Sequence, residues 1–82
     1  MELTIRINID EPIMSRQAAE ISSRMSEFSS RVLLKRKDTQ VNAKSLMGLM
    51  SLGLSSGQAV TILAKGADEA EAACELAKML GA

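Results

Sequence analysis

Two spacings of apolar residues alternate along the chain, and their order limits the fold more than any other feature of the sequence. Over residues 3–9 apolar and polar side chains alternate, which is typical of a strand with one buried face. Over residues 15–28 the apolar side chains recur at helical spacing. The members of that stripe are Ala18, Ile21, Met25 and Phe28. Pro12 separates the two segments, because proline lacks a backbone donor and disfavours helix at the residue before it.

The same two spacings predict the rest of the chain. We expect strands at 31–37, 39–43 and 59–65, and helices at 46–52 and 69–80. The segment from Lys37 to Thr39 has the composition of a tight turn, so the strands on either side of it form a hairpin. Strands with one apolar face need a layer of helices on that face. The sequence therefore predicts an α+β fold, a two-layer sandwich with a mostly antiparallel sheet, and residues 1–82 are expected to form one domain.

Residues with known capping preferences mark the helix ends. Ser45 is a favoured N-cap, since its hydroxyl can accept an N–H group of the first turn, and Gly53 is a favoured stop. Asp68 is expected to cap the last helix, and Arg16 is expected to contact Glu20 one turn later. The buried stripe predicted for the last helix consists of Ala70, Ala73, Cys74, Ala77 and Leu80.

Composition excludes several classes of function. Ten basic and ten acidic residues give a net charge of zero, and the chain has one Phe and no Trp or Tyr, so it does not fit a general nucleic-acid binder. With no histidine and Cys74 as the only cysteine, we predict no disulfide, no metal site and no cofactor. No apolar run approaches the roughly 20 residues of a membrane span, and the N-terminus lacks the apolar region of a signal peptide. We expect a cytoplasmic protein without membrane contact.

The stretch from Val41 to Gly53 resembles a known family. It reads VNAKSLMGLMSLG and, together with Val60–Ile62 and Gly66–Glu69, is similar to the HPr family, the histidine-containing phosphocarrier proteins of the bacterial sugar phosphotransferase system. The resemblance covers nearly the whole chain in length and element order. It implies an open-faced sandwich of βαββαβα order, in which three helices cover one face of four antiparallel strands.

The phosphorylated histidine of that family has no counterpart in this chain. In the family it belongs to a Gly-Ile-His-Ala-Arg-Pro-Ala segment, which matches residues 12–18 and places Met14 at the histidine position. Arg16 matches the phosphate-binding arginine, whereas Gln17 replaces the proline. A thioether cannot form a transferable phosphoramidate, so transfer through histidine is excluded and we predict no catalytic residue. Ser15 offers a substitute acceptor, although a phosphoserine ester is a poor phosphoryl donor.

The resemblance implies a second site at Ser45. In related proteins the matching serine is phosphorylated by a bifunctional HPr kinase/phosphorylase, and the product is a corepressor for a LacI-type catabolite-control regulator. Crh-like members lack the histidine and keep this serine, as this chain does. The resemblance therefore implies a non-enzymatic regulatory protein. Its predicted contact surface comprises Arg16, Leu46, Met47 and Met50, since so short and apolar a helix cannot bury every side chain.

Other interpretations are compatible with the sequence. Ser45 also suits a purely structural N-cap, and the chain also suits a constitutive scaffold. A third hypothesis is a phosphocarrier that uses another acceptor and contacts phosphotransferase-system proteins. Among the remaining features, Cys74 is interpreted as inert core and the segment Lys35–Lys37 as the solvated end of a hairpin.

Overall fold

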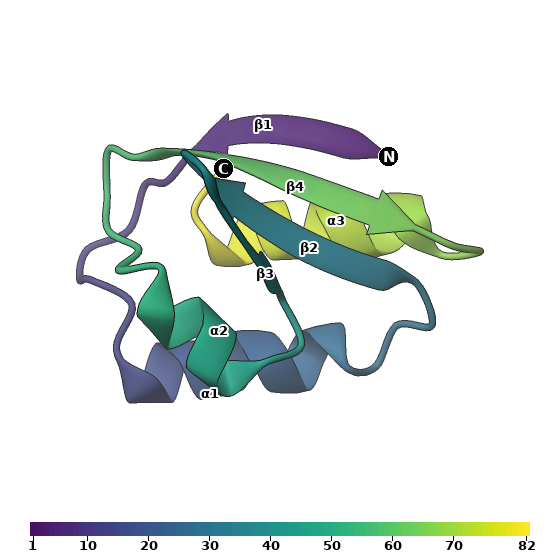
Figure 1. Cartoon of the computed structure of the whole chain (residues 1–82), viewed down its shortest axis with the longest axis horizontal. Helices are drawn as coiled ribbons and strands as arrows, with labels where there is room; N and C mark the ends of the chain where they lie inside the picture. The colour runs from purple at the N-terminus through teal and green to yellow at the C-terminus, as the bar shows by residue number, and fades with distance from the viewer.

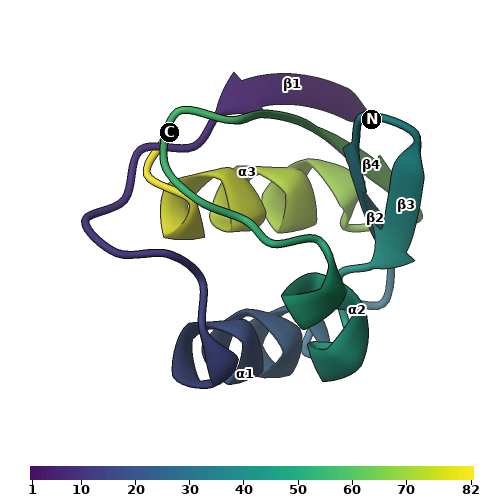
Figure 2. The same ribbon diagram turned by 60° about the vertical axis from the view of Figure 1, so that its left-hand side comes forward.

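Four antiparallel strands form one sheet, and three helices cover one of its faces (Figures 1 and 2). The computed structural model describes the whole chain, residues 1–82. Its elements are β1 (Glu2–Arg6), α1 (Ser15–Met25), β2 (Arg31–Arg36), β3 (Thr39–Asn42), α2 (Leu46–Ser51), β4 (Ala59–Lys65) and α3 (Glu69–Met79). The strands lie in the order β1-β4-β2-β3. The predicted α+β class, its βαββαβα order and its open-faced sheet are confirmed.

The core lies between the sheet and the helical layer. Alternate residues of β2 and β4 point into it, and they are Val32, Leu34, Val60, Ile62 and Ala64. The stripe predicted for α1 is confirmed, because its first three members are buried and Phe28 packs against them partly exposed. Aliphatic and methionine side chains therefore build the buried cluster without a buried aromatic ring.

Six of the seven elements end one to three residues before their predicted ends, and the ends of β1, α1 and β2 show the pattern. β1 ends at Arg6: the Ile7 N–H still bonds the Gln58 carbonyl oxygen in register, but the Ile7 carbonyl oxygen accepts from the Gly57 N–H instead, at 2.8 Å. α1 ends at Met25 rather than three residues later. β2 stops before Lys37, which adopts a φ of 54° in the hairpin turn. The periodicity of the sequence thus continues slightly past the residue at which the regular backbone hydrogen bonding of each element ends.

The buried face of α3 matches the predicted stripe only in part. The buried residues at this end of the chain are Ala72, Ala73, Leu76, Ala77 and Leu80. Ala73, Ala77 and Leu80 are buried as predicted, whereas Ala70 and Cys74 are exposed. The predicted stripe is therefore wrong at these two positions, and so is the interpretation of Cys74 as core. Successive helical residues are about 100° apart, which places Cys74 roughly 200° from Leu76. Alanines occur around most of this helix, and the larger leucine decides which side faces the sheet.

The side chain of Asp68 does not cap α3, although Asp68 occupies the N-cap position. Its carboxylate reaches the loop before β2, where it accepts the backbone N–H groups of Ser29 and Ser30 at 2.9 Å each and the Ser30 hydroxyl. The bond from the Ser30 hydroxyl is the largest of the causes that lower the pKa of Asp68 from its ordinary 3.8 to about 2. The prediction that the Asp68 side chain caps α3 is therefore wrong. Its carboxylate instead links the start of α3 to the loop before β2.

Asp68→Asn is expected to destabilise the protein at neutral pH and to matter less in acid. A carboxylate whose pKa is lowered by folding stabilises the native state above its unfolded pKa, and that stabilisation is lost as pH falls through its folded pKa. The loss of unfolding free energy caused by Asp68→Asn should thus be fully present above pH 3.8 and should decrease as the pH falls toward about 2. Urea unfolding of both proteins over this range measures the difference. A penalty independent of pH would contradict a role for the ionised carboxylate.

Candidate functional site

α1 begins with an unreactive residue at its N-cap. Met14 has an extended backbone and is 63% exposed, and its side chain makes no capping hydrogen bond. Gln17 supplies the reciprocal half of a capping box, since its Oε1 accepts the Met14 N–H at 3.2 Å. The first helical bond runs from the Ala18 N–H to the Met14 carbonyl oxygen, at 2.9 Å. Met14, predicted to stand at the family's histidine position, thus presents a thioether to solvent at the start of a regular helix.

Ser15 and Arg16 are exposed on the first turn of α1. The chain's ion pairs are Met1–Glu69, Arg24–Glu27 and Arg24–Glu75. The expected pair between Arg16 and Glu20 is not among them, so that prediction is wrong. Arg16 keeps a guanidinium without a carboxylate partner, two residues after the exposed thioether of Met14.

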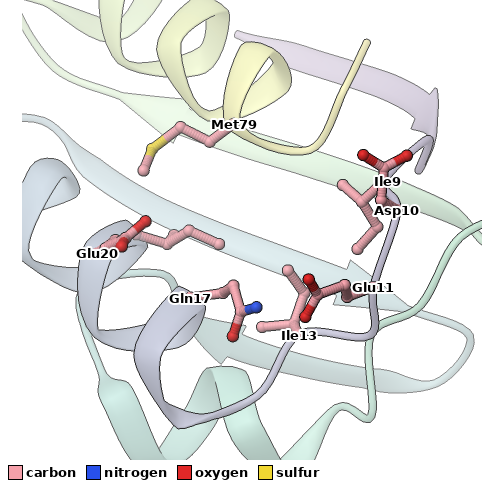
Figure 3. Close-up of a pocket in the computed structure, with 8 residues that line it drawn as sticks. Ile9, Asp10, Glu11, Ile13, Gln17, Glu20 and Met79 are labelled. Atoms are coloured by element: carbon pink, nitrogen blue, oxygen red, sulfur yellow. The ribbon is translucent and has the colours of Figure 1, made fainter.

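A hollow of about 340 Å³ lies between the loop before α1, the first turns of α1 and the end of α3 (Figure 3). Its lining residues are Ile9, Asp10, Glu11, Ile13, Gln17, Glu20, Ile21 and Met79. Three carboxylates, Asp10, Glu11 and Glu20, line it, and none of them forms an ion pair. The field in this hollow is therefore negative, and it disfavours a phosphoryl group there.

Ser45 caps α2 as predicted. Its Oγ accepts the Gly48 N–H at 3.1 Å, and its carbonyl oxygen accepts the Leu49 N–H at 3.0 Å. A side chain at position 48 would crowd this cap, because a Cβ on Gly48 would lie 3.3 Å from the Ser45 Oγ and 3.1 Å from the Val41 Cβ. α2 stops as predicted before Gly53, whose φ is 61°. Ser45 is half-buried, and its hydroxyl oxygen is engaged by the Gly48 N–H.

Two cations that sequence reasoning did not assign to the site fix α2 in place. The Lys44 ammonium donates to the carbonyl oxygen of Phe28 at 2.7 Å, which ties the start of α2 to the segment after α1. The Arg36 guanidinium donates to the carbonyl oxygen of Leu52 at 3.1 Å, at the other end of α2. Arg36 is therefore not a solvated hairpin residue, and that interpretation is wrong for it. Neither partner is near its cation in sequence, so no local pattern could have revealed these bonds.

Exposed apolar side chains gather on α2 and the start of α1. The exposed fractions are 39% for Leu46, 81% for Met47, 46% for Met50 and 63% for Met14. The two helices lie side by side (Figure 2), and the Ile13 N–H bonds the Leu54 carbonyl oxygen at 3.0 Å where their ends meet. We call Met14, Arg16, Ser45, Leu46, Met47 and Met50 the α1–α2 surface. An exposed apolar group of this kind marks a partner site more often than chance exposure.

Side chains that could bind a metal are dispersed over the molecule. No group of three or more histidine, cysteine, aspartate or glutamate side chains lies close enough together to hold a metal ion. The functional groups of the α1–α2 surface are a hydroxyl, a guanidinium, three thioethers and one aliphatic side chain.

None of the helices combines the length and apolar character needed to cross a membrane.

Comparison with known proteins links the whole chain to one family. Residues 1–82 match the family model described as "PTS HPr component phosphorylation site". The chain is 41% identical over 73 residues to the HPr-like protein Crh of Bacillus subtilis, which covers 89% of this chain and 86% of that protein. It resembles the solved phosphocarrier protein HPr of Bacillus anthracis with a TM-score of 0.92 at 29% identity, over 98% of this chain and 95% of the other.

This chain also resembles a crystal structure of Crh, the catabolite repression protein of Bacillus subtilis, which forms a dimer with a swapped domain. The TM-score is 0.77 at 38% identity, over 93% of this chain and 90% of the other. The family match extends over the full length and includes the segment around Ser45. The chain therefore belongs to the HPr family.

Proposed function

We propose that this chain is a regulatory, non-enzymatic member of the HPr family, and that phosphorylation of Ser45 switches its protein partners. The observation that carries the proposal is the pair of residues at the two family sites. A thioether stands at the carrier position, Met14, while the serine at the start of α2 is kept. The proposed partners are an HPr kinase/phosphorylase and a LacI-type catabolite-control regulator, both in the cytoplasm.

The chemistry at α1 supports a role other than carrying phosphate. A carrier needs a nucleophile whose phosphoryl bond is easily broken again, and a neutral sulfur with two carbon substituents offers none. The carboxylates of Asp10 and Glu11, in the loop just before α1, add negative charge ahead of the helix. Arg16 remains as a cation with no carboxylate partner, and in the proposed role it contacts a partner rather than a bound phosphoryl group.

The geometry of α2 supports Ser45 as the switch. A phosphate on its hydroxyl adds roughly −1.5 to −2 charge and three acceptor oxygens. At an N-cap this charge lies at the positive end of the helix, so the fold tolerates it without rearrangement. The cap bond to Gly48 shows where the hydroxyl lies, and Leu46 and Met47 follow it directly on the exposed side. A partner with an arginine-lined pocket beside an apolar groove could recognise both features together.

Titration calorimetry against a purified LacI-type regulator tests the switch. We expect the chain phosphorylated on Ser45 to bind at least about tenfold more tightly than the unmodified chain, because the phosphate adds one or more charge-assisted hydrogen bonds. Ser45→Ala treated with the kinase is the matched control and should bind like the unmodified chain. Equal affinity of the modified and unmodified chains would instead indicate a constitutive scaffold.

A further inference from the structure

Charge is unevenly distributed over the molecule, although the chain is neutral overall. The sheet face away from the helices is uncovered and presents the outward residues of all four strands (Figures 1 and 2). The charged residues at its outward positions are Glu2, Arg6, Arg31, Lys35 and Lys65. Four cations thus stand against one carboxylate, whereas most acidic residues lie on the helices and loops.

Two of these cations face each other across the ladder. Arg31 lies directly opposite Lys65 in the β2–β4 pairing, and neither forms an ion pair. Like charges in directly opposed positions destabilise a sheet. Glu69 offsets part of this repulsion, since the charge of Lys65 is one of the causes that lower the pKa of Glu69, but Glu69 is already paired with the Met1 ammonium. A carboxylate supplied by another molecule would relieve the repulsion further.

A hollow of about 620 Å³ adjoins this pair of cations. Its floor is apolar, because Leu33 and Leu63 lie opposite each other in the same ladder and are both half-buried. Arg31 and Lys65 line it as well, together with Glu2, which forms no ion pair, and Glu69, which is paired with the ammonium of Met1 at the same hollow. The hollow therefore combines a recessed apolar floor with a cationic end.

We propose that this hollow, which we call the sheet-face site (Arg31, Leu33, Leu63 and Lys65), docks an acidic segment of a partner protein. The segment inserts one apolar side chain between the leucines and places flanking carboxylates against the two cations. The apolar contact supplies the anchor, and the opposite charges set the orientation and the rate of encounter. The contact does not depend on Ser45, because the α1–α2 surface belongs to the helical layer.

Other anionic partners match the sheet-face site less well. A flat bilayer surface does not reach leucines that lie at the floor of a hollow, whereas a protruding side chain does. Single-stranded nucleic acid stacks its bases on aromatic side chains. The chain's one aromatic ring, Phe28, packs against the core in the helical layer, with the Arg24 guanidinium 5.5 Å from its centre.

NMR titration of the ¹⁵N-labelled full chain tests the proposal with a synthetic heptapeptide that carries one leucine between two pairs of glutamates. We expect shifts confined to the backbone amides of β2 and β4 around Leu33 and Leu63. A matched heptapeptide with lysines in place of the glutamates, and one with glycine in place of the leucine, should each bind at least about tenfold more weakly. Absence of shifts at millimolar peptide, or shifts confined to the helical layer, would overturn the proposal.

A charge reversal separates binding from folding. Arg31→Glu places a carboxylate opposite Lys65, so it should raise the melting temperature slightly and weaken peptide binding at least about fivefold. Lys78→Glu makes the same change of charge on α3 and should leave peptide binding unchanged. Equal binding by the Arg31→Glu variant would contradict the site. Tighter binding of anionic phosphatidylglycerol vesicles or of a poly-dT oligonucleotide than of the peptide would also contradict it.

Discussion

Exchanging Met47 and Met50 for serine is expected to weaken binding of the Ser45-phosphorylated chain to a LacI-type regulator by about a hundredfold, or roughly 3 kcal/mol. Both side chains are exposed in the free protein, Met47 at 81% and Met50 at 46%, so a partner can cover them completely. Methionine is flexible and polarizable, which suits an adaptable apolar contact. The loss should appear in calorimetry as a raised Kd.

The fold of this double variant should change little, because exposed side chains contribute little to stability. Leu3→Ser is the matched control, since Leu3 is 36% exposed on the edge strand β1, in the sheet rather than the helical layer. It removes an exposed apolar side chain outside the α1–α2 surface and should leave regulator binding within about twofold. If the control and the double variant bind equally, α2 is not the contact surface.

The strands and the capped helix of this fold could be predicted because their signals are local. Alternation in residues 59–65 places three side chains of β4 in the core, and Ser45 and Gly53 mark the ends of α2 within a few residues of the bonds they make. The exposure of Met47 and Met50 also followed from local facts, since so short an apolar helix has only one side to bury.

The features that sequence reasoning missed depend on contacts between distant segments. Asp68 has the right residue type and position for a cap, yet its carboxylate binds a loop 38 residues earlier, at Ser30. The anchors of α2 are also long-range, because Arg36 and Lys44 each reach a carbonyl oxygen 16 residues away. A charged or capping residue can be identified in the sequence as a hydrogen-bond donor or acceptor, but its partner is known only from the folded chain.

The stripe predicted for α3 was wrong at Ala70 and Cys74 for a different reason. Alanine fits both a buried and an exposed position, so a helix rich in alanine has no clear apolar stripe. Leu76 is the largest buried side chain within the helix. Because Leu76 faces the core, Cys74 lies on the opposite side and is exposed to solvent. A prediction weighted by side-chain size would have placed this helix correctly.

Phosphoryl labelling by two routes tests most directly whether the chain is phosphorylated on Ser45 by a kinase or accepts a phosphoryl group as a carrier. One arm supplies phosphoenolpyruvate and the first enzyme of the sugar phosphotransferase system, and the other supplies ATP and HPr kinase/phosphorylase. Intact-mass spectrometry and peptide mapping locate the phosphate. Met14→His is the positive control for the first arm, since it restores a ring nitrogen at the N-cap of α1 beside Arg16.

We predict no label on the natural chain in the first arm, label on Met14→His in the same arm, and one phosphate on Ser45 in the second arm that is absent from Ser45→Ala. The opposite result would contradict the account: a labile phosphate accepted from the first enzyme by the natural chain and passed on to a sugar permease, with Ser45 left unmodified by the kinase.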